Sequence, residues 1–175
     1  MKRALLAAAL VTAPAFLGPA AAFAQSPEEA VAYAFLGIAD GATLKRATTT
    51  MAWKETKTAP ATFEGDVDVG GRKATLRFIV HPTDTCHYEI TIEGPVSFVP
   101  GNSRLYGRVS MGEIESVGLS ADGYKADIAG SGFCETGPVN PACVSVGGPD
   151  LFGSPDRAKQ KEAVDLLVAT CGAKP

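Results

Sequence analysis

Residues 62–93, TFEGDVDVGGRKATLRFIVHPTDTCHYEITIE, alternate apolar and polar side chains through most of their length. Because successive side chains of a β-strand point to opposite faces, this period of two predicts strands with one apolar and one charged face. Gly70-Gly71 interrupts the alternation and supplies the positive φ angles that a two-residue hairpin turn requires. The stretch therefore predicts an antiparallel hairpin, which a third strand extends beyond Pro82.

The turn at Gly70-Gly71 also predicts which residues face each other across the first hairpin. It places Asp68 opposite Lys73 and Glu64 opposite Arg77, so that unlike charges meet on the polar face. A slip of one residue would move every side chain to the other face, and the charged rows therefore specify the strand alignment. Each exposed ion pair adds only about 0.2 to 1 kcal/mol to stability.

A second turn is predicted at Pro82-Thr83-Asp84. A three-residue loop at this position places Arg77 opposite Glu89 and Lys73 opposite Glu93, which again brings unlike charges together. Two independent turns thus predict matching rows of charge on the same solvated face.

Helical patterns stand at both ends of this β-rich region. Ser26 is followed by proline and two glutamates, the pattern of a capping box, and predicts a helix over Pro27–Ala39. Near the end of the chain Ser154 is the predicted N-cap, Pro155 the first helical residue and Gly172 the C-terminal stop.

Between the helices, additional strands and turns are predicted from composition and alternation. The predicted strands are 48–54, 95–99, 104–110, 113–119 and 124–128, and the residues predicted to form a Gly- and Pro-rich loop are 130–149. The predicted fold class is α+β: a twisted antiparallel β-meander of about six to eight strands, with the N-terminal and the C-terminal helix packed on its apolar face.

The first residues have the layout of an export signal. Lys2 and Arg3 precede a long apolar run that ends in Ala22-Phe23-Ala24, a small-x-small cleavage site. We expect residues 1–24 to be a cleaved signal peptide and residues 25–175 to form a single α+β domain in the periplasm or outside the cell. The alternative is a retained membrane anchor, which Pro14, Gly18 and Pro19 disfavour because they interrupt the apolar run. After cleavage no stable membrane insertion is expected.

The four cysteines, Cys86, Cys134, Cys143 and Cys171, all follow the leader, and an even number in an oxidising compartment favours disulfides. Three pairings are possible. The tight Gly- and Pro-containing loop between Cys134 and Cys143 favours that bond, which leaves Cys86 to pair with Cys171. Chain entropy predicts about 2.7 kcal/mol from the short loop and about 4.6 kcal/mol from the long one.

Charge limits the classes of partner. The chain carries 16 basic and 19 acidic residues, with a formal charge of −3, and its two basic leader residues leave on cleavage. A mildly acidic chain without a Lys/Arg cluster lacks the footprint that phosphate backbones attract, so no nucleic acid partner is expected.

No sequence motif survives as a catalytic, cofactor or metal site. The run from Asp66 to Gly71 resembles the start of a calcium loop, but its twelfth position is Arg77 where a bidentate Glu is required. Adjacent Cys86 and His87 do not have the spacing of zinc ligands, and the G-x-S-x-G turn of serine hydrolases is missing. We expect no catalytic residue, no cofactor and no metal ligand.

Two functions from different classes are consistent with the sequence. The favoured one is a non-catalytic domain that binds a small molecule, a glycan or a protein in the cell envelope. The alternative is a small hydrolase that uses carboxylates or the pair His81 and His87, which are predicted to lie diagonally across neighbouring strands near Asp84. Several aromatic residues are predicted either to fill the core or to line a ligand pocket: Trp53, Phe63, Phe78, Tyr88 and Tyr106.

Overall fold

The computed structural model describes residues 25–137, 142–145 and 148–172, so the predicted leader lies outside the described residues. The strands are β1 (Thr43–Arg46), β2 (Thr49–Thr58), β3 (Ala61–Val69), β4 (Arg72–Pro82), β5 (His87–Glu93), β6 (Ser103–Ser110), β7 (Ile114–Leu119), β8 (Ala126–Gly130), β9 (Phe133–Thr136) and β10 (Cys143–Ser145). The helices are α1 (Pro27–Val31), the π-helical turn η1 (Ala32–Leu36), the 3-10 turn η2 (Met111–Glu113) and α2 (Arg157–Cys171).

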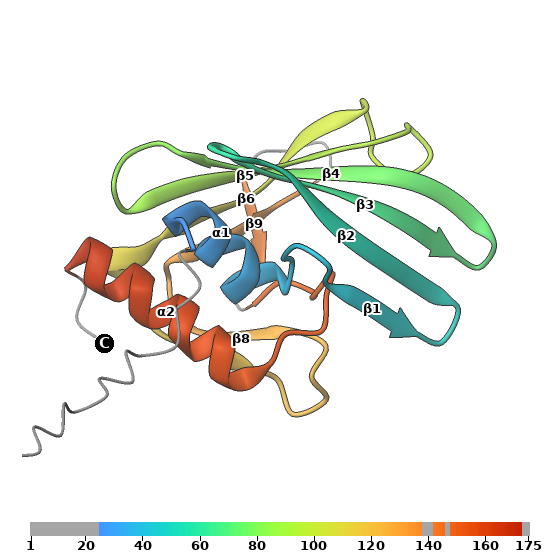
Figure 1. Cartoon of the computed structure of the whole chain (residues 1–175). Helices are drawn as coiled ribbons and strands as arrows, with labels where there is room; N and C mark the ends of the chain where they lie inside the picture. Colours follow the sequence, from blue (N-terminus) through green and yellow to red (C-terminus); the bar gives the residue numbers. More distant parts are fainter. Residues whose placement is uncertain (1–24, 138–141, 146–147, 173–175) are drawn as a thin grey trace, which may run out of the picture.

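The described residues form a mostly antiparallel β-sheet with two helices, and the fold is broadly α+β. The main sheet has eight strands in the order β1-β2-β3-β4-β5-β6-β9-β10, and β7 pairs with β8 in a separate two-stranded sheet. The first six strands follow one another as a meander. Figure 1 shows the long strands β2–β4 reaching beyond the helices, which cover one side of the sheet.

The predicted register of the first hairpin is confirmed. Gly70 and Gly71 form the turn with φ of 60° and 84°, and Asp68 stands opposite Lys73. Glu64 stands opposite Arg77 and binds it at 2.6 Å between carboxylate oxygen and guanidinium nitrogen. The Asp68 carboxylate also accepts the Gly71 N–H at 2.8 Å, which closes the turn.

The predicted register of the second hairpin is wrong by four residues. Arg77 stands opposite Glu93 rather than Glu89, and binds it at 3.1 Å. The reason is the turn itself: β4 continues through Pro82, and the Asp84 carboxylate accepts the N–H groups of Cys86 and His87 at 2.8 and 3.0 Å. An even shift keeps every side chain on its predicted face, so alternation alone does not distinguish the two alignments.

Glu89 accordingly has other neighbours than the sequence predicts. It stands opposite His81 on β4 and binds Arg108 of β6 at 3.0 Å. Lys73 has Asp68 as its cross-strand partner on β3 and does not pair with Glu93.

Two other predictions for the sheet change in the structure, which also contains one strand that the sequence does not predict. Residues 95–99 do not form a strand, because the N–H groups of Phe98 and Val99 both bond back to the Pro95 carbonyl at 2.8 Å in a tight turn. The edge strand β1 was not predicted. The segment 130–149, predicted as a loop, contains β9 and β10, and β9 pairs with β6 to continue the main sheet.

The N-terminal helix begins where the sequence predicts. Ser26 accepts the Glu29 N–H at 3.1 Å while the Glu29 carboxylate accepts the Ser26 N–H at 2.7 Å, a complete capping box. The helix ends earlier than the predicted Ala39, because Gly37 adopts a left-handed conformation with φ of 69° directly after η1.

The C-terminal helix begins two residues later than predicted. Asp156, and not Ser154, is the N-cap, and its carboxylate accepts the N–H groups of Ala158 and Lys159 at 2.9 and 3.1 Å. Pro155 therefore precedes the helix. Gly172 ends it with φ of 59°, as predicted.

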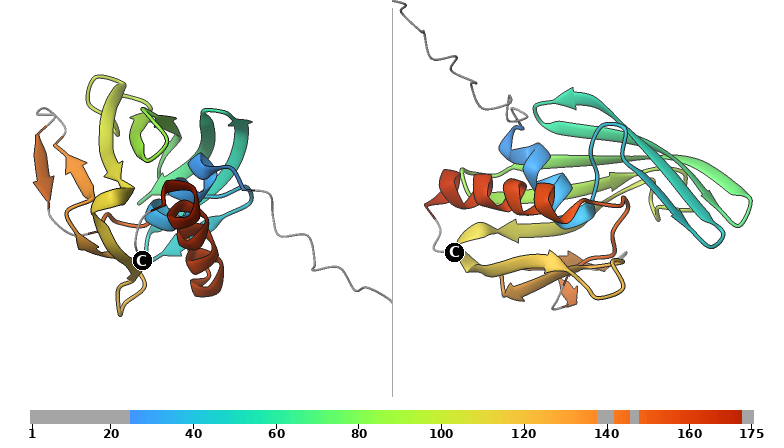
Figure 2. Two further views of the ribbon diagram at one scale, coloured as in Figure 1. Left: turned by 90° about the vertical axis from the view of Figure 1, so that its left-hand side faces the viewer. Right: turned by 60° about the horizontal axis from the view of Figure 1, so that its bottom comes forward.

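The two helices pack differently. Residues of α1 and η1 enter the core and contact β4 and β8, whereas α2 lies mainly against α1, η1 and β7. The β7–β8 hairpin lies on the side of the helices away from β2–β4 (Figures 1 and 2). The prediction that both helices pack on the apolar face of the main sheet is thus only partly supported.

The core lies between the concave face of the main sheet and α1–η1. Its aromatic centre is Phe78, whose ring lies 5.4 Å from that of Trp53, 5.6 Å from Tyr106 and 4.7 Å from Phe152, centroid to centroid. The Trp53 indole N–H donates to the Phe152 carbonyl at 2.6 Å, which fastens the segment before α2 to β2.

Two disulfides join Cys86 to Cys171 and Cys134 to Cys143. These are the pairs that the loop argument favours. The first attaches the last residue of α2 to the β4–β5 turn, and the second joins β9 to β10 across a separation of 9 residues.

Candidate functional site

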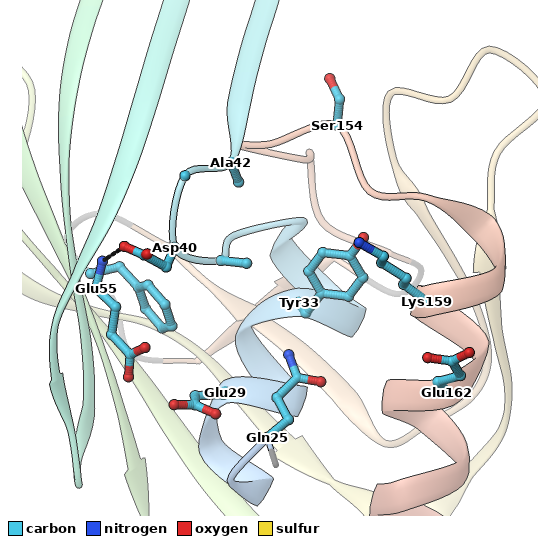
Figure 3. A pocket seen from close by; sticks show the side chains of 12 residues that line it. Gln25, Glu29, Tyr33, Asp40, Ala42, Glu55, Ser154, Lys159 and Glu162 are labelled. Atoms are coloured by element: carbon cyan, nitrogen blue, oxygen red, sulfur yellow. Dashed lines mark hydrogen bonds between the residues drawn. The ribbon is translucent and has the colours of Figure 1, made fainter. Parts of the chain in front are cut away.

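A cleft of about 540 Å³ opens between α1–η1, the loop that follows them, β2–β3 and the first turns of α2. This volume is within the range of small-molecule sites, about 300 to 1,000 Å³. The residues that line the cleft are Gln25, Glu29, Tyr33, Ala39, Asp40, Gly41, Ala42, Glu55, Phe63, Ser154, Lys159 and Glu162. Figure 3 shows these side chains converging from four different segments of the chain.

The capping box positions the first acidic side chain. One oxygen of Glu29 is held by the Ser26 N–H, and this fixes the carboxylate at the end of α1 that opens on the cleft. In Figure 3 the Glu29 carboxylate faces that of Glu55 on β2. A local sequence requirement, the helix cap, thus determines where one wall of the cleft carries its charge.

Glu55 is the acid in the cleft whose pKa is most strongly raised. Burial raises its pKa first, and a hydrogen bond to Glu29 together with the negative charges of Glu29 and Asp40 raises it further, to about 7. Its Oε1 atom is buried and receives no hydrogen bond from the described residues. Because a second carboxylate lies beside it, Glu55 favours its protonated form.

The loop after η1 holds Glu55 in place through the backbone. Asp40 Oδ1 accepts the Glu55 N–H at 3.0 Å, shown as the dashed line in Figure 3. Trp53 is bonded in the same region, with its N–H to Ala42 O at 2.8 Å and its carbonyl accepting the Gly41 N–H at 3.0 Å. This part of β2 and the loop therefore form one rigid wall.

The opposite wall comes from η1 and α2. The Tyr33 hydroxyl accepts the Asp156 N–H at 2.9 Å, and burial raises the pKa of this phenol. Lys159 and Glu162 point from α2 toward the same space. Because Glu29, Asp40, Glu55 and Glu162 are acidic and Lys159 is basic, the cleft has a mixed but mainly acidic lining.

The histidines singled out in the sequence lie elsewhere. His87 Nδ1 is 2.8 Å from the Asp84 carboxylate, within an exposed turn, and His81 is on β4 opposite Glu89. The Asp84 pKa is lowered, mainly by the hydrogen bond from the Cys86 N–H and then by His87. Neither histidine lines the cleft. Within the part of the chain that the structure describes, no group of three or more His, Cys, Asp or Glu is placed to hold a metal ion.

The other candidate positions are parts of the sheet and core. Asp66 to Gly71 forms the end of β3 and its turn, and Asp66 accepts a hydrogen bond from the Thr75 hydroxyl at 3.1 Å. Of the five aromatic candidates, Phe63 lines the cleft. The other four, Trp53, Phe78, Tyr88 and Tyr106, are buried in the core.

Sequence reasoning assigned no functional role to Glu29 or Glu55. Glu29 was interpreted only as a capping residue. The sequence does contain a signal for Glu55. Residues 53 and 55 of a strand point to the same face, so a carboxylate two residues after a core tryptophan is expected on the apolar face. A charge on that face indicates either a partner or a cavity.

Comparison with protein-family models, with characterised proteins and with solved structures finds no match for this chain. Among the described helices, none is long and apolar enough to cross a membrane.

Proposed function

We propose that this chain is an exported, non-catalytic domain, in the periplasm or outside the cell, that binds a small molecule in the acidic cleft. The observation that carries the proposal is the cleft of about 540 Å³, which four separate parts of the fold build around a carboxyl pair. The leader pattern and the two disulfides support an oxidising compartment.

The surface supports a small ligand more than a protein or a long glycan. Among the described residues only Val96 and Tyr124 are large hydrophobic side chains with exposed surface, and two residues do not make an apolar docking patch. The cleft instead combines the Phe63 and Tyr33 rings with charged groups on both of its walls. Apolar walls with a few convergent polar groups are typical of small-molecule sites.

The proposal is tested by native mass spectrometry of protein purified from its own cell envelope without denaturation. We expect a small molecule that stays bound to the wild type and is released on unfolding. Ala39→Trp, which fills the cleft, should lose that molecule. Ala52→Trp places the same side chain at an exposed position on β2 that does not line the cleft, and this variant should retain the molecule. No retained molecule in the wild type, or equal retention in Ala39→Trp, would contradict the proposal.

A second candidate function is acid–base hydrolysis, and the raised pKa of Glu55 is the observation that favours it. A carboxyl that holds a proton near pH 7 is suited to act as a general acid, and the Glu29 carboxyl lies beside it. The binding proposal predicts no turnover of nitrophenyl esters or glycosides. Turnover that Glu55→Gln abolishes while the fold is kept would replace binding by hydrolysis.

A further inference from the structure

The backbone nitrogen of Gln25 lies close to the Glu29 carboxylate, one member of the carboxyl pair of the cleft. The Ser26 nitrogen is 2.7 Å from Glu29 Oε2. Consecutive backbone nitrogens are separated by at most about 3.7 Å, because only the N–Cα, Cα–C and C–N bonds connect them. The Gln25 nitrogen is therefore at most about 6.4 Å from Glu29 Oε2, the sum of that limit and the 2.7 Å bond. The Gln25 side chain itself lines the cleft (Figure 3).

The chemical state of this nitrogen depends on processing. In the unprocessed chain it is a neutral amide that follows Ala24. Cleavage after Ala22-Phe23-Ala24 converts it into an α-amine, whose ordinary pKa of about 7.7 to 8.0 makes it largely an ammonium ion at neutral pH. The same covalent cut thus adds a positive charge at a fixed place in the cleft.

We propose that removal of residues 1–24 creates an ion pair within the cleft, between the α-ammonium of Gln25 and the carboxyl pair of Glu29 and Glu55. The inference rests on the proposed processing and goes beyond the proposed ligand binding, because it assigns a role in the site to the chain's own new terminus.

The charges around the cleft favour this pairing. Glu29 from α1, Asp40 from the loop, Glu55 from β2 and Glu162 from α2 all face the space, and Tyr33 contributes a neutral phenol. Among the described residues that line the cleft, Lys159 of α2 is the one with a basic side chain. An opposite charge within about 4 to 6 Å stabilises a carboxylate, so the new ammonium should favour ionised Glu55 and should itself be held in the charged form.

The consequence is a site whose charge changes on export. Before processing, the raised pKa of Glu55 lets it hold a proton near neutral pH. After processing, the ammonium takes the place of that proton, and the cleft becomes a site with both signs of charge, suited to zwitterionic or neutral polar ligands rather than to simple cations.

Two chains made in the laboratory separate these states. One begins at Gln25, released from a fusion by a specific protease, and the other carries a Gly-Ser extension before Gln25. The pKa of Glu55 is read from its side-chain carboxyl carbon by NMR titration. We expect this pKa to be lower in the chain that begins at Gln25, by about half to one unit, and the α-amine pKa to rise above its ordinary value.

Matched variants identify the partner. In the chain that begins at Gln25, Glu55→Gln should return the α-amine pKa toward the ordinary value, whereas Glu115→Gln, an exposed carboxylate on β7, should leave it unchanged.

Cyclisation of an N-terminal glutamine, in which the α-amine attacks the side-chain amide carbon and ammonia leaves, removes the charge. The comparison is therefore repeated with Gln25→Ala in both chains, and the mass of each chain is checked.

Equal Glu55 pKa values in the two chains, or a higher value in the chain that begins at Gln25, would overturn the inference. This outcome is distinguishable from failure of the other proposals. The N-terminal mass of exported protein tests cleavage by itself, and ligand retention tests binding by itself.

Discussion

Glu55 stands two residues after Trp53 on the same face of β2, yet its carboxyl lies among other acids at the edge of the core. Burial alone raises the pKa of a carboxyl, and the neighbouring charges of Glu29 and Asp40 act in the same direction. The folded state disfavours the ionised form of Glu55. The stability of the fold is therefore expected to depend on pH.

The sign of this dependence follows from the two pKa values. Glu55 has an ordinary pKa of 4.5 and a folded-state pKa of about 7 when Gln25 is preceded by other residues. The folded state therefore binds the proton more tightly, and the contribution of Glu55 is most favourable below the unfolded value and is lost as the pH rises through about 7. As the pH rises, we expect the ionisation of Glu55 to lower the free energy of unfolding by about 1 to 2 kcal/mol. This is less than the full pKa shift would give, because solvent in the open cleft screens the charge.

Urea denaturation of the Gly-Ser-extended chain from about pH 5 to about pH 8 measures this effect, with Glu55→Gln as the matched variant. The difference in stability between wild type and variant should move in favour of the variant as the pH rises. A constant difference across this range would show that Glu55 titrates with an ordinary pKa.

Gly65 shows how closely the sheet packs on Trp53. It stands opposite Trp53 across the β2–β3 pair, and a Cβ atom at this position would collide with the indole ring. Gly65→Ala is therefore expected to destabilise the fold by about 1 to 3 kcal/mol. Gly112→Ala, where a Cβ meets nothing within 4 Å, should change stability by less than about 0.5 kcal/mol. Similar unfolding midpoints for the two variants would contradict this packing.

At the scale of elements, the start of α2 differs between the sequence prediction, in which Ser154 is the N-cap, and the structure, in which Asp156 is the N-cap. Asp156→Ala removes the acceptor of two helix N–H groups and should cost about 0.5 to 2 kcal/mol. Ser154→Ala should have little effect on stability. Thermal unfolding followed by circular dichroism compares the two, and a greater loss for Ser154→Ala would restore the start predicted from the sequence.

Sequence patterns predicted the elements whose signals are local. The Gly70-Gly71 turn fixes the β3–β4 register through adjacent residues, and the capping box at Ser26 fixes the first helical turn. The β4–β5 register was missed because Asp84 bonds forward to the next backbone groups and makes a longer turn. Since an even shift preserves both faces, amphipathic alternation contains no information about it.

The candidate site was not predictable to the same degree, because its residues meet only through tertiary structure. Glu29 and Glu55 are 26 positions apart in the numbering, and Glu162 comes from the last helix. Strand parity places Glu55 on the apolar face, but it does not reveal that the Glu29 cap faces the same space. The pairing of β9 with β6 was missed for a related reason, since the intervening β7–β8 hairpin separates the two strands along the chain.

At the scale of the whole molecule, the two disulfides constrain very different lengths of chain. Cys86 and Cys171 are separated by 85 positions, whereas Cys134 and Cys143 are separated by 9. Chain entropy predicts that replacing the first pair by alanine costs about 4 to 5 kcal/mol and the second about 2 to 3 kcal/mol. Guanidinium unfolding of the two double variants should show the larger loss for Cys86→Ala/Cys171→Ala. The reverse order would show that strain or residual unfolded-state structure dominates.

The long disulfide also has a consequence for the cleft. It attaches the end of α2 to the β4–β5 turn, while the Tyr33 hydroxyl holds the Asp156 N–H at the start of α2. The helix that carries Lys159 and Glu162 is thus fastened at both ends, and the cleft is expected to keep its shape whether or not a molecule is bound.

Occupation of the cleft by a small molecule is tested most directly by a crystal structure of protein purified from its source without denaturation. We predict a bound small molecule in the cleft, with a polar atom about 2.7 to 3.2 Å from Glu29 or Glu55. A cleft that contains only ordered water in such material would contradict the account.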